Sequence, residues 1–213
     1  MKNIALVTLA CGALLASCGG KVSEMKQSID NLQEVAKAGE KMQQAQDQAK
    51  KVYDERRAKG DTVAMPYKDL QGYLPTSIAG FKPAGDPSGS QQSMPGYSVS
   101  VAQQDWVGES DGKKLSVIVS DYGGTEAAYG LASVAWSMNL SQEDDNQKVH
   151  TEKFDDNGSG GVVTYNKKDH QVNIVSGTRY RYGVTTTLTG ATDDQTAMVT
   201  DLTKNILKKF DGK

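Results

Sequence analysis

The chain has 213 residues, of which 37% are hydrophobic and 23% are charged, and its formal net charge is −2. Its mean hydropathy is −0.54. This length suits one domain with an appendage. A charge this close to neutral lacks the basic footprint of nucleic-acid-binding proteins, so we expect no nucleic-acid partner.

Residues 1–17 have the pattern of a cleaved secretory signal peptide. Lys2 supplies a positive start, and an apolar run from Ile4 to Leu15 follows it. That run is too short to cross a hydrocarbon core of about 30 Å, which needs roughly 20 apolar residues. A charged start, a short apolar core and small residues before a cut site are instead typical of an export signal.

The tetrad Leu15-Ala16-Ser17-Cys18 at the end of this leader resembles the lipobox of bacterial lipoproteins. In that family the cysteine thiol receives diacylglycerol, a dedicated peptidase cuts before it, and the new amino terminus is often acylated too. Two or more acyl chains anchor a soluble domain stably, whereas one chain binds only marginally. The resemblance therefore implies that Cys18 is lipidated and that lipid attaches the protein to a membrane of the bacterial cell envelope.

The neighbours of Cys18 bear on which membrane that is. Gly19 and Gly20 stand where enteric-type lipoproteins retained in the inner membrane carry an Asp, which implies outer-membrane delivery in a host of that type. The alternative is an ordinary signal peptide with an incidental cysteine. Cys11, the other cysteine, lies inside the apolar core of the leader and would be discarded with it.

Residues 18–60 are expected to hold the lipid anchor and one long polar helix, from Glu24 to Lys59. Nearly every residue of this stretch is a good helix former, and Gly60 is placed to end it. Thirty-six helical residues would span about 54 Å. The apolar seam is narrow and rich in alanine, which leaves three arrangements open. The helix packs on its own domain, stands off as a spacer, or pairs with a helix of a protein partner.

Residues 61–96 contain all five prolines, and this composition predicts a Pro/Gly-rich connector. We expect one short helix over 67–73, and a disordered loop over 84–93.

Residues 97–213 predict an α+β domain in which helices pack on an antiparallel sheet, because hairpins dominate the pattern. Asp111-Gly112 is the expected tip of the first hairpin, and Asp193 or Asp194 the expected cap of the last helix. The expected strands are 97–108, 113–123, 148–154, 161–168, 170–177 and 178–190, with helices over 125–139 and after 194.

This element order resembles that of the PsbP-like α/β/α domains, many of which bind or scaffold other proteins and lack catalytic chemistry. The resemblance rests on element order alone and implies a non-catalytic binding or scaffolding domain. The alternative is a small-molecule carrier or sensor with a pocket between sheet and helices.

Arg179 and Arg181 form the candidate binding site. In the expected last strand they share a face with two threonines, and such a face could bind a carboxylate, a phosphate or an acidic partner. The alternative is a solvated face on which they pair with Glu152 or Asp155 of a neighbouring strand.

No catalytic residue, metal site or cofactor is expected. The two histidines, His150 and His170, lack the spacing of a zinc site, and no cysteine is left to complete one. Residues 155–166 resemble an EF-hand loop, but Asn166 replaces its bidentate Glu and no helices are predicted to flank it, so we interpret them as a hairpin turn.

Overall fold

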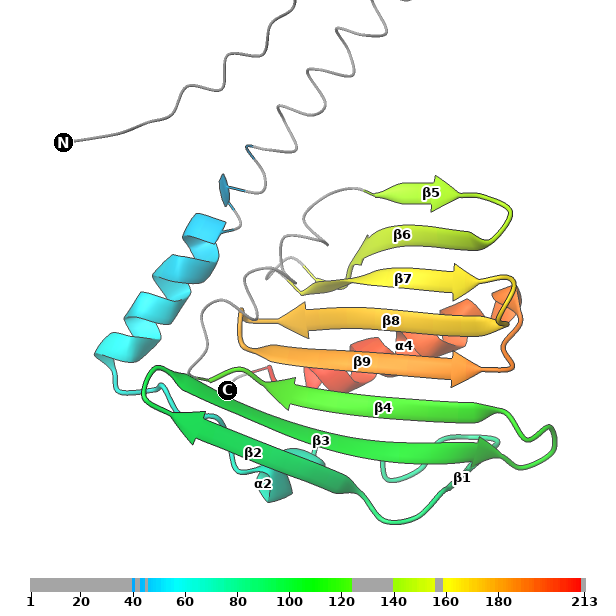
Figure 1. Ribbon diagram of the computed structural model, residues 1–213, viewed down its shortest axis with the longest axis horizontal. Helices are drawn as coiled ribbons and strands as arrows, with labels where there is room; N and C mark the ends of the chain where they lie inside the picture. The colour runs from blue at the N-terminus through cyan, green and yellow to red at the C-terminus, as the bar shows by residue number, and fades with distance from the viewer. Residues whose placement is uncertain (1–39, 41–42, 45, 124–139, 156–158, 212–213) are drawn as a thin grey trace, which may run out of the picture. The chain divides into compact units, whose positions relative to one another are not determined.

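The computed structural model describes residues 40, 43–44, 46–123, 140–155 and 159–211. All of them belong to one compact unit, Ala38–Lys213. They form a single antiparallel sheet of nine strands with helices packed on it (Figure 1), which confirms the expected α+β class. The strands are β1 (Phe81–Pro83), β2 (Ser88–Met94), β3 (Tyr97–Gly108), β4 (Lys114–Asp121), β5 (Ser141–Glu143), β6 (Gln147–Lys153), β7 (Gly160–Asn166), β8 (Gln171–Thr178) and β9 (Tyr182–Thr189).

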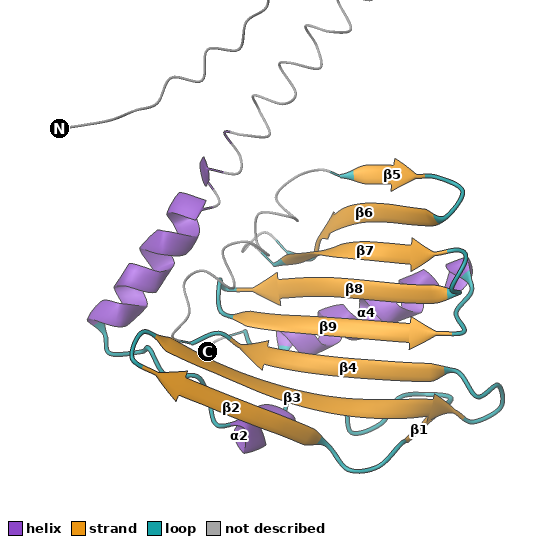
Figure 2. Ribbon diagram, in the orientation of Figure 1, coloured by secondary structure: helices purple, strands orange, loops and turns teal. Residues whose placement is uncertain are grey.

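The strands follow the order β1-β3-β4-β9-β8-β7-β6-β5 (Figure 2). β2 also pairs with β3, on the side away from β4. The described helices are α2 (Tyr67–Gln71), α4 (Thr196–Lys208), a short 3₁₀ turn at Asp193–Gln195, and a helix over residues 46–58. α2 and α4 cover the same face of the sheet (Figure 1).

The core lies between that face and the two helices. In β4 the alternation places Leu115, Val117 and Val119 beneath the helices, with exposed fractions of 1% or less. The ring of Phe210, just after α4, stacks between Tyr73 and Tyr182, with centroid distances of 4.2 and 4.3 Å. Sheet and helices are therefore joined by direct side-chain packing.

The expectation for residues 61–96 was wrong in its main point. The short helix is present as α2, but the stretch predicted as a connector also supplies β1 and β2, and β2 replaces most of the disordered loop. Every residue of β2 is exposed, so no alternation of apolar residues marks it in the sequence. Backbone pairing with β3 forms it, across a tight turn in which Gly96 has φ of 76°.

Two other expectations need correction. β9 begins at Tyr182 and not at residue 178, because residues 179–181 form the turn from β8. The chain enters α4 through the 3₁₀ turn, with Thr192 as the capping residue in place of Asp193 or Asp194. The backbone N–H of Thr192 donates to Gln195 Oε1 at 3.1 Å.

The helix over 46–58 stops one residue before the end predicted at Lys59, and Gly60 follows with φ of 75°, a conformation common just after a helix. Its predicted start, the leader with Cys18, and the predicted helix over 125–139 lie outside the described residues. No helix in the described part of the chain is long and apolar enough to cross a membrane.

Candidate functional site

A groove of about 830 Å³ opens between the helix over 46–58 and the turn from β8 to β9. We call it the basic groove. Its charged lining consists of four cationic side chains and two acidic ones, a formal excess of two positive charges: Arg56, Lys59, Arg179, Arg181, Asp61 and Asp211. Three of the chain's four arginines therefore meet at one place, although Arg56 lies more than 120 residues before the other two in the sequence.

The end of the helix over 46–58 positions Arg56 and Asp61 at the groove. The chain reverses at Gly60, and the N–H of Asp61 donates to the carbonyl of Arg56 at 2.9 Å. The Arg56 side chain donates to Asp61 Oδ2 at 3.2 Å and to the carbonyl of Gly123 at 2.8 Å. The last turn of the helix is thereby tied to the residues that follow β4.

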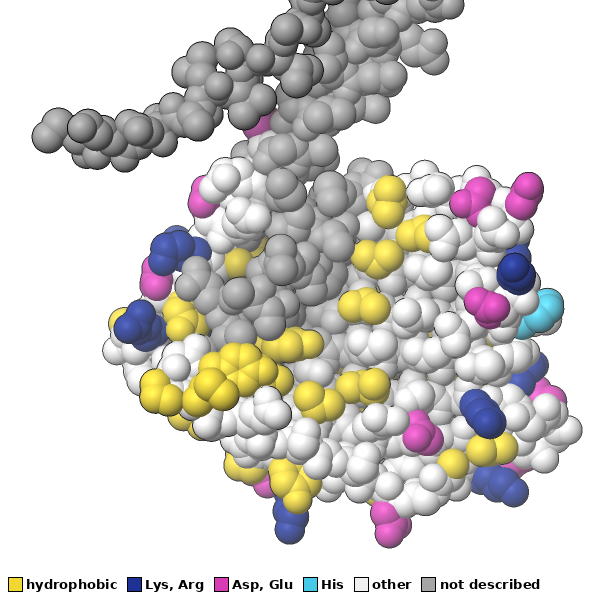
Figure 3. All heavy atoms as spheres, in the orientation of Figure 1, with side chains coloured by type: hydrophobic (Ala, Val, Ile, Leu, Met, Phe, Trp, Pro, Cys, Tyr) yellow, Lys and Arg dark blue, Asp and Glu magenta, His cyan; other side chains and the backbone are white. Residues whose placement is uncertain are grey.

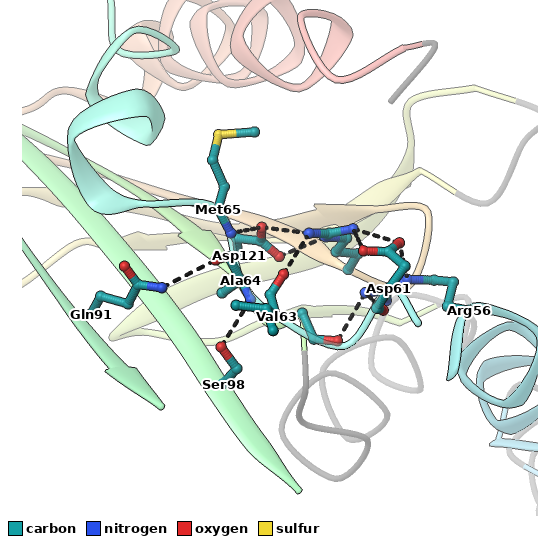
Figure 4. A network of polar contacts seen from close by, with 10 residues as sticks. Arg56, Asp61, Val63, Ala64, Met65, Gln91, Ser98 and Asp121 are labelled. Carbon is teal, nitrogen blue, oxygen red and sulfur yellow. Dashed lines mark hydrogen bonds and ion pairs between the residues drawn. The ribbon is translucent and has the colours of Figure 1, made fainter. Parts of the chain in front are cut away.

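Arg181 lies at the centre of the charge network, between Asp121 and Asp61, two residues that Figure 4 labels. Its guanidinium donates to both carboxylate oxygens of Asp121, at 2.7 and 2.9 Å, and to both oxygens of Asp61, at 2.9 and 2.8 Å. The Asp121 side chain is fully buried, and that of Arg181 is 13% exposed. The contact with Asp121 uses two guanidinium nitrogens, and a forked ion pair of this kind fixes the plane of the guanidinium as well as its position.

The pKa shifts in this network favour the charged forms. Burial opposes the charge on Arg181, but hydrogen bonds and the charge of Asp121 outweigh burial and raise the pKa of Arg181. Burial also opposes ionisation of Asp61. The hydrogen bond from Arg56 and the charges of Arg181 and Arg56 outweigh that burial and lower the pKa of Asp61. Both groups therefore stay charged at neutral pH.

The same network attaches the segment 63–65 to the sheet. Met65 N–H donates to Asp121 Oδ2, and Ala64 N–H donates to Ser98 Oγ, each at 2.8 Å. The approach is close, because a Cβ atom on Gly123 would lie 2.6 Å from the Ala64 nitrogen. Figure 4 shows this segment beside the labelled Asp121 side chain.

The turn from β8 to β9 presents Arg179 and Tyr180 to the groove in an unusual backbone conformation. Their φ angles are 56° and 50°, and the N–H of Arg181 donates to the carbonyl of Thr178 at 3.2 Å. Two consecutive positive φ angles characterise a type I′ turn, where Asn-Gly is the favoured pair. Arg and Tyr carry a steric cost at these positions that Gly avoids.

The expectation that Arg179 and Arg181 share a strand face was therefore wrong, since neither lies on a strand. The structure does bring both to the groove. The alternative pairing with Glu152 or Asp155 was also wrong: Arg181 pairs with Asp121 and Asp61, and Glu152 pairs with Lys204 at 2.6 Å. Arg179 donates to the carbonyl of Phe210 at 3.3 Å.

Two of the four cations remain available to a ligand. Arg56 and Arg181 are engaged with carboxylates, but within the described ranges neither Lys59 nor Arg179 forms an ion pair. Lys59 and Arg179 are both exposed and both line the groove. The arrangement can thus hold an anionic group without breaking the internal ion pairs.

Sequence reasoning missed Arg56, Asp61 and Asp121 as members of this site. Asp121 falls within the expected strand 113–123, and the structure buries it against Arg181. The one sequence signal was the pairing of the arginines, with two at the end of the long helix and two near residue 180. Nothing in the local pattern indicates which carboxylates they meet.

The residues that the sequence analysis considered for metal binding lie in separate parts of the structure. His150 lies on β6 and His170 follows β7 at a positive φ of 49°. Asp155 accepts a hydrogen bond from the Ser159 N–H at 3.0 Å, just before β7 begins. No group of three His, Cys, Asp or Glu side chains within the described ranges is placed to hold a metal ion.

The sheet face opposite α4 carries mainly uncharged side chains, and its hydrophobic ones gather near the turn between β2 and β3 (Figure 3). Val63 and Met94 are the most exposed large hydrophobic residues described, at 61% and 62%. Together with Tyr53, Pro95 and Tyr97 they line a second hollow, of about 450 Å³.

Comparison with known proteins assigns no family. No protein-family model matches the chain, and no curated protein sequence matches it. Among solved structures, an uncharacterised protein from Mycobacterium smegmatis is similar over 65% of this chain and 95% of its own, with 13% identity and a TM-score of 0.28. A likeness at that TM-score carries no argument about function.

Proposed function

We propose that this protein is a bacterial cell-envelope lipoprotein whose α+β domain binds or scaffolds another envelope component without catalysis. The observation that carries the proposal is the leader followed by Leu15-Ala16-Ser17-Cys18. A charged start, a short apolar run and the tetrad occur together and in the right order. In this proposal Cys18 is lipidated, the helix continues from Glu24 to Lys59, and Gly19 and Gly20 direct the protein to the outer membrane.

A binding role is supported by the surface of the domain. The basic groove and the exposed hydrophobic residues near the β2–β3 turn are two distinct features that a partner could contact. The alternative of a carrier with a pocket between sheet and helices gains no such support. Where α4 crosses the sheet, Val199, Ile206 and Phe210 fill the space, each with an exposed fraction of 1% or less.

The anchor is tested by metabolic labelling with a clickable palmitate analogue, followed by membrane fractionation. The chain offers a matched pair of variants, because both cysteines lie in the leader region. Cys18→Ser should lose the label and the membrane fraction. Cys11→Ser should keep both, since that residue is only part of the apolar run. Equal labelling of the two variants, or a soluble wild type, would refute the anchor.

The binding role is tested separately by crosslinking the anchored protein in intact cells. A discrete crosslinked species that is lost when the basic groove or the hydrophobic hollow is altered would support a scaffold. A labelled, membrane-bound protein that gives the same crosslinks after both surfaces are altered would retain the anchor and overturn the role proposed for these surfaces.

A further inference from the structure

We propose that the basic groove binds a phosphate group carried by a larger ligand, with Lys59 and Arg179 as the charged residues that contact it. This inference does not depend on lipidation of Cys18. It begins from the charges, because the groove has a formal excess of two positive charges and both unpaired cations lie at its wall. A phosphate ester presents two or three non-bridging acceptor oxygens, which two separate cations can share.

The internal ion pairs do not engage Lys59 or Arg179, although Arg179 donates one hydrogen bond to the carbonyl of Phe210. Asp61 lies between the guanidinium groups of Arg56 and Arg181, with oxygens 3.2 Å from the first and 2.8 Å from the second. Asp121 is fully buried against Arg181. The remaining acidic residue, Asp211, is exposed and forms no ion pair with a described cation. An incoming anion can therefore contact Lys59 and Arg179 without competing with Asp61 and Asp121 for Arg56 and Arg181.

The backbone of the β8–β9 turn gives the second, independent argument. Arg179 and Tyr180 hold consecutive positive φ angles, which side chains other than Gly and Asn adopt only at a steric cost. Strained residues of this kind concentrate at ligand-binding sites. The helix dipole alone favours basic residues at the end of a helix, which would account for Arg56 and Lys59. It does not account for Arg179, which lies in a turn between strands.

The groove is larger than a phosphate ion and is lined by uncharged side chains beyond the cations. Val52, Tyr180 and Gln48 contribute to its wall, and its volume is about 830 Å³. A space of this size fits the phosphate and the organic group of a phosphate ester better than it fits an inorganic phosphate ion alone. The shared chemistry is the phosphate ester, and its source is either a soluble metabolite or the head group of a lipid.

The experiment is a calorimetric titration of the full-length protein in nonionic detergent. The soluble probes are inorganic phosphate and glycerol 3-phosphate, and the lipid probes are micelles doped with phosphatidylglycerol or with phosphatidylcholine. Binding of glycerol 3-phosphate indicates a soluble ester. Binding of phosphatidylglycerol without the soluble probes indicates a lipid head group. No heat with any probe would overturn the proposal.

Two variants and one control separate the groove from general charge effects. Lys59→Gln, and Arg179→Asn combined with Tyr180→Gly, should each weaken binding by about tenfold or more. The second variant installs the favoured pair for this turn, so its melting temperature should not fall and lost binding cannot be ascribed to unfolding. Arg57→Gln is the control, because Arg57 is exposed on the same helix but lines the other hollow. Equal weakening by the control would overturn the site.

Discussion

At the scale of single residues, Asp121 shows what the charge network contributes to stability. Its carboxylate is fully buried and accepts hydrogen bonds from Arg181 and from the Met65 backbone. Asp121→Asn leaves the guanidinium, 13% exposed, with Asp61 as its remaining carboxylate. Removing one partner of a buried pair costs about 3–5 kcal/mol. We expect a loss of about 3 kcal/mol in the free energy of unfolding, measured by urea denaturation.

The control for this measurement is Asp111→Asn. Asp111 also pairs with a cation, Lys113 at 2.9 Å, but on an exposed turn. Exposed ion pairs contribute little to stability because water screens both charges, so we expect a much smaller loss here. A loss as large in this variant as in Asp121→Asn would show that burial does not determine the cost of removing one partner from an ion pair.

Asp61 gives the network a dependence on pH. Its pKa is lowered below the ordinary value of 3.8 in the folded protein. The unfolded chain therefore binds a proton at higher pH than the folded one, and the stabilising effect is complete only above the ordinary pKa. This effect is lost as the pH falls from about 4 through the lower folded pKa. Unfolding free energies measured from pH 7 to pH 2.5 should fall less steeply in Asp61→Asn than in wild type. Identical slopes would contradict the assignment.

At the scale of elements, the segment 63–65 lies so close to the chain after β4 that Gly123, the second residue beyond that strand, must be small. In Gly123→Ala the added Cβ would meet the backbone of Val63 and Ala64 at 2.6–2.7 Å, and that backbone is held by hydrogen bonds. We expect Gly123→Ala to destabilise the fold by about 1–3 kcal/mol, the usual cost of overpacking. Thermal or urea unfolding measures the loss.

Gly96→Ala is the matched control for this steric effect. Gly96 has open space around it but a positive φ of 76°, so alanine there meets only the backbone cost of about 1 kcal/mol. The two variants also differ in a second readout. Gly123→Ala should speed amide hydrogen exchange at Ala64 and Met65, whose N–H groups donate to the sheet, while Gly96→Ala should leave those amides unchanged.

The strands that could be predicted from sequence are those with one face buried against helices. β3, β4 and β8 follow their expected ranges closely, because alternating burial leaves an alternating sequence. β2 escaped prediction for the opposite reason: all seven of its residues are exposed, and its position depends on backbone pairing. The start of β9 was misplaced because Arg179 and Tyr180 form a turn without its usual Asn-Gly pair.

The candidate site was predictable only in part, for a similar reason. Arg179 and Arg181 could be selected because they are charged residues close together in the chain. Their partners could not, since Arg181 meets Asp121 and Asp61 from 60 and 120 residues away. Long-range ion pairs leave no periodic pattern in the sequence. They appear only once the sheet order has placed β4 beside β9.

At the scale of the whole molecule, the compact unit that contains the sheet also includes the helix over 46–58, and we expect this helix to contribute to the stability of the fold. The unit begins at Ala38, and Arg56 bonds to both Asp61 and Gly123. A chain of residues 38–213 should therefore unfold with the same urea midpoint as residues 19–213. A chain of residues 61–213 should unfold at lower urea, because Asp61 loses Arg56. Arg56→Ala in residues 38–213 should reproduce part of that loss. If residues 61–213 matched the longer chains, the helix would be a spacer that contributes nothing to the fold.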